Sequence, residues 1–272
     1  MSAAVDPTVL DRVVAALTQL PAGLLTDIDG TISRIAPTAD AAYVEPTARA
    51  ALARLTDRLA LVAAVSGRST TDAARLIGLP RLVYIGNHGL ERQTATGARV
   101  EPQALPYIPL IVATLAAAAR EADRIGLRGL IFEDKGATAS IHYRLAPDPA
   151  TARARLAELL ARLPEAQALH LTEGRMVFEL RPPLRIGKGE GVRALITEYG
   201  LRGAVFLGDD VTDLDAMREL RQLTATEGVV GVNIGVAAPE APPELAAMAD
   251  CLVQGVDGVC ALLTAVADRL ER

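Results

Sequence analysis

The stretch GLLTDIDG, residues 23–30, joins a continuous apolar run to two aspartates and a glycine. An uninterrupted apolar run of this kind is typical of a strand buried on both faces of a sheet. Three more runs end in small polar residues in the same way: ALVAAVSGR (60–68), RLVYIGNHG (81–89) and GAVFLGDD (203–210). Helical patterns alternate with these strands, which predicts an α/β fold with a doubly wound, Rossmann-like parallel-sheet core. The further segments of this core are a strand at 228–236 and helices at 48–59, 70–79, 187–200, 212–220 and 255–270.

The middle of the chain follows a different plan, because its predicted strands are neighbours in sequence. The order αββαββ favours a small antiparallel sheet backed by two helices. We therefore predict an inserted α+β cap domain at 104–183, with the core divided into 1–103 and 184–272. The cap elements are predicted as a helix at 107–126, strands at 128–136 and 137–145, a helix at 149–163, and strands at 168–174 and 175–182.

Composition excludes several classes of protein. The 272 residues are 50% hydrophobic and carry a net charge of −5, which argues against a nucleic-acid partner. The first residues, MSAAVDPTVL, lack the basic start of a signal peptide, and no apolar run is expected to span a membrane. Cys251 and Cys260 are expected to be small core residues. These features predict a cytoplasmic globular protein, either a monomer or an oligomer of unknown size.

Asp27 and Asp29 form the first acidic pair. Two residues apart on an extended backbone, their side chains face the same side, where two carboxylates repel each other. A hard divalent cation such as Mg²⁺ removes that conflict, and Gly30 allows a sharp turn after the acids. The alternative is a strand-to-loop transition that happens to be rich in Asp and Gly.

GDDVTD, residues 208–213, provides a second acidic cluster at the end of another strand. Asp209 suits a metal ligand, whereas Asp213 could equally serve as an acid in the first turn of a helix. Ser66, Gly67 and Arg68 offer a hydroxyl and backbone N–H groups for a phosphate, although a simple helix cap explains them as well.

Lysine is rare in this chain: among 28 basic residues, only Lys135 and Lys188 are lysines. Lys188 lies near a predicted helix start, where a cation is locally unfavourable unless an anion binds beside it. A compact ammonium fits between a carboxylate and a phosphate, where a planar guanidinium would crowd the site. The alternative is a solvated lysine at the helix start.

Four motifs in this order resemble the haloacid dehalogenase superfamily of phosphatases: DIDGT (27–31), Ser66 of SGR, Lys188 and GDDVTD. The position of the insertion resembles the C2 type of cap. GNHGLE, FEDKGATASIHYR, GRMVFELRP and FLGDDVTDLDAM resemble trehalose-6-phosphate phosphatases more closely, and the similarity extends from about residue 22 to 260.

The resemblance implies a two-step phosphoryl transfer. Asp27 is then the nucleophile that forms an aspartyl-phosphate, and Asp29 is the general acid and base. Mg²⁺ is expected at Asp27, the backbone carbonyl of Asp29, and Asp209, with Asp213 or Asp210 in support. The phosphoryl oxygens are expected at Ser66 and Lys188, together with the adjacent Gly67 and Arg68.

In the same family, positions that match Glu133, Lys135 and Glu179 bind sugar hydroxyls. The alternative for Glu133 and Lys135 is an exposed hairpin ion pair of little energetic value. His88 is a candidate substrate contact or an ordinary loop residue. His142 and Arg144 alternate with Tyr143 on a predicted cap strand, so one face of that strand could point at the cleft, and the role of His142 is left open.

The leading interpretation is a Mg²⁺-dependent phosphatase for trehalose 6-phosphate, a small-molecule sugar phosphate. An enzyme for another sugar phosphate, such as sucrose or glucosylglycerol phosphate, is the nearest alternative. A phosphoacceptor signalling domain is disfavoured because it is smaller and has no counterpart of Asp29. A catalytically silent partner of a trehalose-phosphate synthase is the third possibility.

Overall fold

The computed structural model describes residues 5–36, 38 and 41–271 of the chain. These residues form two compact units, unit 1 (Met1–Arg99 with Ile186–Arg272) and unit 2 (Val100–Arg185). The segment expected as a cap, 104–183, lies within unit 2.

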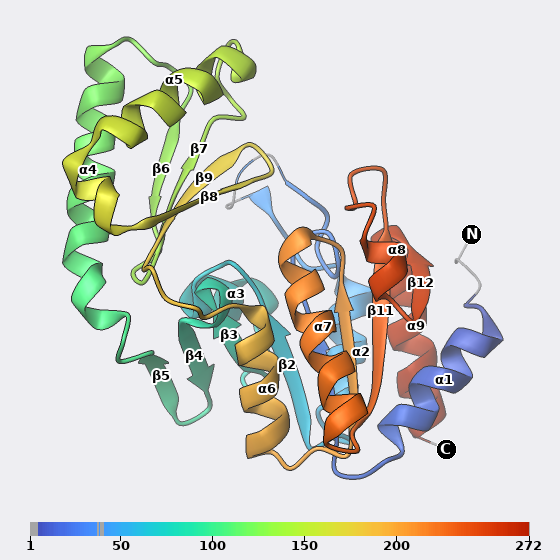
Figure 1. The fold of residues 1–272 in the computed structure, drawn as a ribbon. Helices are drawn as coiled ribbons and strands as arrows, with labels where there is room; N and C mark the ends of the chain where they lie inside the picture. Colours follow the sequence, from blue (N-terminus) through green and yellow to red (C-terminus); the bar gives the residue numbers. More distant parts are fainter. Residues whose placement is uncertain (1–4, 37, 39–40, 272) are drawn as a thin grey trace. The chain divides into compact units, whose positions relative to one another are not determined.

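Unit 1 is built on an eight-stranded sheet with the order β12-β11-β10-β1-β2-β3-β4-β5 (Figure 1). The strands from β12 to β3 are parallel, and β4 pairs with β3 in the antiparallel direction. The predicted α/β class with a parallel core sheet is thus confirmed. The strands are β1 (Ala22–Thr26), β2 (Leu61–Val65), β3 (Val83–Gly86), β4 (Glu91–Thr94), β5 (Gly97–Val100), β10 (Gly203–Gly208), β11 (Val230–Ala237) and β12 (Cys251–Gln254).

Helices cover both faces of this sheet, as expected for parallel strands that are apolar throughout. One apolar core lies between the sheet and α1, α2, α3 and α9, and a second lies between the sheet and α6, α7 and α8. Cys260 is buried in the first core and Cys251 is partly exposed. The helices are α1 (Pro7–Leu17), α2 (Pro46–Leu55), α3 (Thr70–Ile77), α6 (Lys188–Glu198), α7 (Val211–Thr226), α8 (Leu245–Met248) and α9 (Gly255–Leu270), with a 3₁₀ turn η2 (Asn87–Gly89).

The register of the parallel strands brings several loops to one edge of the sheet. Thr26, the last residue of β1, pairs with Leu207 on one side and with Ala64 on the other. Val65 in turn pairs with Ile85 of β3. The polar segments that follow these strands therefore begin side by side, at the edge where doubly wound folds bind ligands.

The sequence did not predict α1, the β4–β5 hairpin, α8 or β12 of unit 1. The hairpin sequences ERQT and GARV contain few apolar residues and lie at a sheet edge, so they carry no buried-strand pattern. β12 is a four-residue edge strand that depends on its pairing with β11. In α1, Val9, Val13 and Leu17 do repeat at helical spacing and are buried.

Unit 2 contains a four-stranded antiparallel sheet with the order β6-β7-β9-β8. The predicted αββαββ order is observed. Its elements are η3 (Leu105–Tyr107), α4 (Ile108–Arg124), β6 (Ile131–Asp134), β7 (Ala139–His142), α5 (Pro149–Arg162), η4 (Pro164–Ala168), β8 (His170–Gly174) and β9 (Val177–Arg181).

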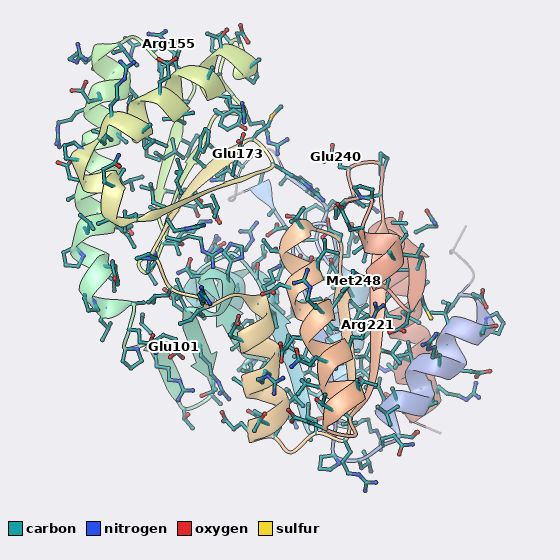
Figure 2. All side chains as sticks on the ribbon, viewed as in Figure 1. Glu101, Arg155, Glu173, Arg221, Glu240 and Met248 are labelled. Atoms are coloured by element: carbon teal, nitrogen blue, oxygen red, sulfur yellow. The ribbon has the colours of Figure 1, made fainter. Side chains whose placement is uncertain are left out.

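The two faces of this sheet differ in polarity. One face of the sheet points toward the helices. Its side chains Ile141, Phe178 and Leu180 pack with the buried side chains of the helices in one apolar core. Glu173, labelled in Figure 2, accepts hydrogen bonds from Tyr143 Oη (2.9 Å) and Arg153 of α5 (Nη2, 2.6 Å). Ser140 and its register partners Glu133 and Glu179 occupy the opposite face, because side chains alternate along a strand.

By length and composition alone, one helical segment of the described residues could cross a membrane, namely Leu105–Arg124 with a mean hydropathy of 1.2. The sequence had predicted a helix at 107–126 but no segment that spans a membrane. Ile111, Ala118 and Ala122 on this segment are buried in the core of unit 2. Of the window that meets this criterion, 28% is buried within the protein.

Candidate active site

Three buried carboxylates meet at the carboxyl edge of the unit 1 sheet. Asp27 follows β1, Asp209 follows β10, and Asp213 lies in the first turn of α7. They are 4%, 1% and 0% exposed, and one oxygen of each lies within 4.8 Å of the others. Carboxylates this close and this buried repel each other unless a cation lies among them.

Lys188, the first residue of α6, supplies one positive charge to this cluster. Its Nζ donates to Asp27 Oδ1 and to Asp213 Oδ1, both at 2.7 Å, and the side chain is buried. Burial disfavours the ammonium, but Asp213 and Asp27 outweigh it and raise the pKa of Lys188. The lysine is therefore charged at every physiological pH, and the alternative of a solvated helix-start residue does not fit.

One ammonium does not neutralise three carboxylates. Burial is the main cause that raises the pKa of Asp27 well above its ordinary range, and Asp213 and Asp209 add to it against the effect of Lys188. The cluster thus carries excess negative charge in a buried place, and its donors are all hard oxygen atoms. This donor set fits a divalent cation of the Mg²⁺ type.

Gly30 allows the backbone to approach Asp209 closely. A Cβ at this position would lie 2.2 Å from Asp209 Oδ2, and the φ of +94° also favours glycine. Thr31, the next residue, donates its hydroxyl to Asp209 Oδ1 at 3.2 Å. The DIDGT segment therefore holds the acid that follows β10.

Asp213 also organises the turn that precedes α7. Its Oδ2 accepts the backbone N–H groups of Asp209 and Asp210, both at 2.9 Å, while its Oδ1 accepts from Lys188. Asp210 is the N-cap residue of the helix. The Asp213 side chain therefore does both: it accepts hydrogen bonds at the start of the helix, and it contacts Lys188.

Asp29 lies in a different environment from Asp27. Arg68 donates from Nε to Asp29 Oδ2 (2.6 Å) and from Nη2 to Asp29 Oδ1 (2.8 Å), and it also donates to Asp72. β1 ends at Thr26, so the alternation of a strand does not extend to Asp29. The metal-capable group in the described residues contains Asp27, Asp209 and Asp213, and Asp29 is not part of it.

The SGR segment is fastened by the GNHG loop. Asn87 N–H donates to the Arg68 carbonyl at 2.7 Å, and His88 N–H donates to the Ser66 carbonyl at 3.0 Å. The ring of buried His88 lies over Gly67, where an added Cβ would come within 2.6 Å of it. Asn87 and His88 have φ values of 47° and 56°, a region that few non-glycine residues adopt. His88 is therefore part of the support of this loop.

Two supporting acids were missed by the sequence analysis. Glu91 is buried, and its Oε2 accepts Thr70 N–H (2.9 Å) at the start of α3. Asp215 accepts Gly189 N–H (3.1 Å) and so ties the start of α6, next to Lys188, to α7. Neither acid belongs to a spaced motif, although Asp215 follows Asp213 by two residues and Glu91 lies within GNHGLE.

The three residues expected to read a sugar lie together on the polar face of the unit 2 sheet. Glu133 pairs in register with Ser140, and Ser140 pairs with Glu179. Lys135 Nζ lies 3.2 Å from Glu179 Oε1, with side chains only 10% and 14% exposed. An exposed hairpin ion pair, the alternative considered for Glu133 and Lys135, therefore does not describe Lys135.

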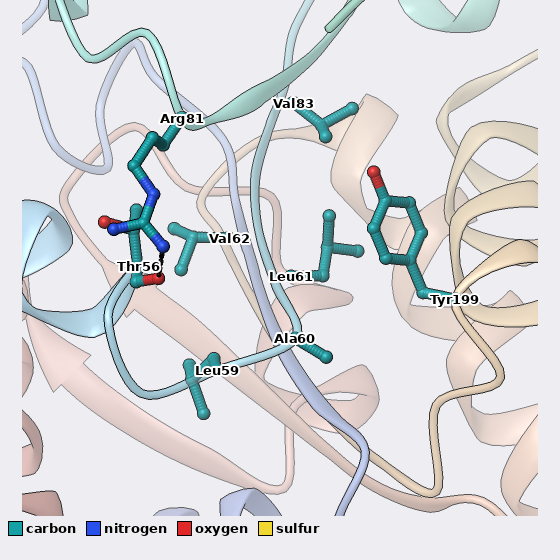
Figure 3. Close-up of a pocket in the computed structure, with 8 residues that line it drawn as sticks. All are labelled: Thr56, Leu59, Ala60, Leu61, Val62, Arg81, Val83 and Tyr199. Atoms are coloured by element: carbon teal, nitrogen blue, oxygen red, sulfur yellow. Dashed lines mark hydrogen bonds between the residues drawn. The ribbon is translucent and has the colours of Figure 1, made fainter. Parts of the chain in front are cut away.

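A small cavity of about 100 Å³ lies elsewhere in unit 1 (Figure 3). Leu61 and Val83, the first residues of β2 and β3, line it, and Arg81 donates to the Thr56 carbonyl beside it at 2.8 Å. This is the amino end of the strands, opposite to the acids. The cavity contains none of the candidate catalytic side chains.

The fold defines the class of protein. A haloacid dehalogenase-like hydrolase from Bacteroides thetaiotaomicron superposes with a TM-score of 0.58 and 15% identity, covering 92% of this chain and 98% of that one. The C-terminal domain of the C. albicans trehalose-6-phosphate phosphatase superposes with a TM-score of 0.77 and 18% identity, covering 99% of both chains. The chain thus has the haloacid dehalogenase-like fold.

The family follows from the sequence comparison. The family model Trehalose-phosphatase matches residues 25–244, so the chain belongs to the trehalose-phosphatase family. A trehalose-phosphate phosphatase from Mycobacterium avium is 37% identical over 205 residues, which cover 72% of this chain and 50% of that protein. A probable trehalose-phosphate phosphatase from Sinorhizobium fredii is 34% identical over 221 residues, covering 79% and 78%. The chain spans about half the length of the mycobacterial relatives it matches.

Proposed function

We propose that the chain is a divalent-metal-dependent phosphatase that hydrolyses trehalose 6-phosphate to trehalose and phosphate. The observation that carries the proposal is the buried Lys188 ammonium, 2.7 Å from both Asp27 and Asp213, beside Asp209. Such a cluster matches a reaction whose catalysis is mainly positioning and charge neutralisation.

Asp27 and Asp209 are the proposed side-chain ligands of Mg²⁺, and Asp213 supports them. Asp213 is given the supporting role because both of its oxygens accept hydrogen bonds within the protein. When bound, the cation supplies neutralisation of the phosphoryl oxygens and of the crowded carboxylates. The backbone carbonyl of Asp29 is a further proposed ligand by resemblance to the family.

In the proposed first step, an Asp27 oxygen forms a bond to phosphorus while the bond from phosphorus to the sugar oxygen breaks. Asp29 gives its proton to that sugar oxygen. In the second step, water attacks phosphorus, Asp29 takes a proton from it, and the bond to Asp27 breaks to release phosphate. The ion pair of Asp29 with Arg68 must open for the acid to act, so Arg68 serves Asp29 rather than the phosphate in the resting enzyme.

Ser66 and Lys188 are the proposed holders of the phosphoryl oxygens, with the Gly67 N–H beside them. Lys188 also orients Asp27 and opposes the rise in its pKa. His88 is proposed to shape this loop from above Gly67, since its ring packs there.

We propose that Glu133, Lys135 and Glu179 bind the disaccharide. These charged groups hydrogen-bond hydroxyls, and a site built in this way discriminates strongly against substrates that lack them. The names of the mycobacterial and rhizobial relatives support the same substrate.

A substrate panel tests the proposal. Phosphate release from trehalose 6-phosphate, sucrose 6-phosphate, glucosylglycerol phosphate, glucose 6-phosphate and p-nitrophenyl phosphate is measured with Mg²⁺ and with a chelator. We expect the highest kcat/KM with trehalose 6-phosphate and no turnover with chelator. Equal kcat/KM on glucose 6-phosphate would exclude the disaccharide assignment, and absence of all turnover would favour a silent partner protein.

A further inference from the structure

His142 is placed on the polar face of the unit 2 sheet by its strand register. On β7, Ser140 and His142 point to one side, and Ile141 between them points into the apolar core. His142 pairs in register with Ile131, and Ser140 pairs with Glu133, so His142 and Glu133 are diagonal neighbours on one face. Diagonal neighbours across antiparallel strands are within reach of long side chains.

The side chains of this diagonal pair are in contact. His142 Nε2 lies 3.0 Å from Glu133 Oε2, and the two side chains are 34% and 30% exposed. A carboxylate accepts hydrogen bonds, and a ring nitrogen that carries a hydrogen donates them. The contact therefore restrains the orientation of the Glu133 carboxylate.

Glu179, the neighbouring glutamate, is oriented by similar contacts. Glu179 Oε1 lies 3.2 Å from Lys135 Nζ and 3.4 Å from Ser140 Oγ. Each of the two glutamates proposed to read the sugar is thus contacted by a side chain from β7. Glu133 differs because its β7 contact is a ring nitrogen.

We propose that His142 is a positioning residue for substrate specificity, which holds the Glu133 carboxylate in the orientation that accepts a sugar hydroxyl. This inference rests on the proposed function and deepens it. A glutamate side chain that is 30% exposed has several rotamers, and fixing one before the substrate arrives removes that entropic cost from binding. The effect is therefore expected in KM for the sugar phosphate and not in kcat.

The test compares three substitutions at position 142 in the full chain. His142→Gln places an amide N–H₂ near the position of Nε2, whereas His142→Asn places it near Nδ1. We expect His142→Ala and His142→Asn to raise KM for trehalose 6-phosphate about 3- to 10-fold with kcat little changed, and His142→Gln to recover most of the loss. KM for p-nitrophenyl phosphate, which has no sugar hydroxyls, should follow the wild type in all three.

His170 provides the matched control. It begins β8, is exposed, and pairs in register with Arg181 at the far edge of the same sheet. His170→Ala should leave both substrates at wild-type values. The double variant Glu133→Gln with His142→Ala should raise KM no more than Glu133→Gln alone, because the two residues act as one unit.

Two results would overturn the inference: an unchanged KM for trehalose 6-phosphate in His142→Ala, or equal losses in the Gln and Asn variants. A fall in kcat on both substrates would also overturn it, since that would mark a general structural role. Failure of the proposed function is distinguishable, because the wild type itself would then show no preference for trehalose 6-phosphate.

Discussion

The acidic edge of unit 1 and the polar face of unit 2 both combine lysine with carboxylates, but they do so under different physical conditions. Around Lys188 the charges are almost wholly buried and the contacts are 2.7 Å. Around Lys135 the contact to Glu179 is 3.2 Å, and the nearby Glu133 and His142 are about one-third exposed.

This difference matches the two tasks proposed for these regions. A buried cluster of like charges destabilises the fold, and a bound cation with a transferring phosphoryl group would offset that cost. A half-buried polar surface costs less and can exchange its water for the hydroxyls of a neutral sugar. Substitutions in unit 1 should therefore affect turnover on every substrate, whereas those in unit 2 should depend on the substrate.

The largest effect is expected for Asp27→Asn, which removes the proposed nucleophile while keeping its size. kcat should fall about 1,000-fold or more on both trehalose 6-phosphate and p-nitrophenyl phosphate. Circular dichroism should remain that of the wild type. Asp11→Asn, at an exposed position on α1, is the control and should be fully active. Near-normal activity of Asp27→Asn would refute the assigned nucleophile.

Lys188→Arg tests whether the buried charge must also be compact. The planar guanidinium does not fit between Asp27 and Asp213, so we expect a loss in kcat of about 100-fold on both substrates. Arg193→Lys, at a partly exposed position of the same helix that pairs with Glu219 and Glu227, should stay within about twofold of the wild type. If Lys188→Arg turned over at the normal rate, charge alone would suffice and the steric argument would fail.

Lys135→Ala separates the two regions directly. It should lower kcat/KM for trehalose 6-phosphate by about 10- to 100-fold through lost hydroxyl contacts and the lost ion pair with Glu179, with a much smaller change on p-nitrophenyl phosphate. Arg162→Ala, at a position 81% exposed on α5, is the control in the same unit. Equal losses on both substrates would show that Lys135 does not read the sugar.

The smallest expected effect is on stability. Because burial, with Asp213 and Asp209, raises the pKa of Asp27, its neutral form is favoured in the metal-free fold. The stability that the neutral Asp27 carboxyl contributes is fully present below the pKa of the unfolded state. It is lost as the pH rises through the raised pKa of the folded state. Mg²⁺ at ten times its Kd should then add about 1.4 kcal/mol at neutral pH.

Thermal unfolding measures this contribution as an increase in Tm on adding Mg²⁺. Protons compete with the cation for Asp27, so the Mg²⁺ concentration at half-maximal shift should increase toward pH about 5. Asp209→Asn should reduce the shift at every pH. A midpoint that did not move with pH would mean that Asp27 does not bind the metal.

Much of unit 1 was accessible from the printed sequence. Strands such as 60–68 and 203–210 are continuously apolar, and parallel strands must place their carboxyl ends at one edge, so Asp27 and Asp209 were expected to meet. Lys188 was singled out by the scarcity of lysine. The β4–β5 hairpin and β12 were not predicted, because short edge strands carry little apolar signal of their own.

Local patterns were thus enough for the fold class, the αββαββ order of the insertion and the position of the acids, since strand and helix periodicities are properties of neighbouring residues. The partners of individual side chains came only with the folded chain. The Arg68–Asp29 ion pair, the His88 ring over Gly67, and the Glu133–His142 contact join residues from different elements. Contacts of this kind depend on loop conformation and strand register, which a linear pattern does not encode.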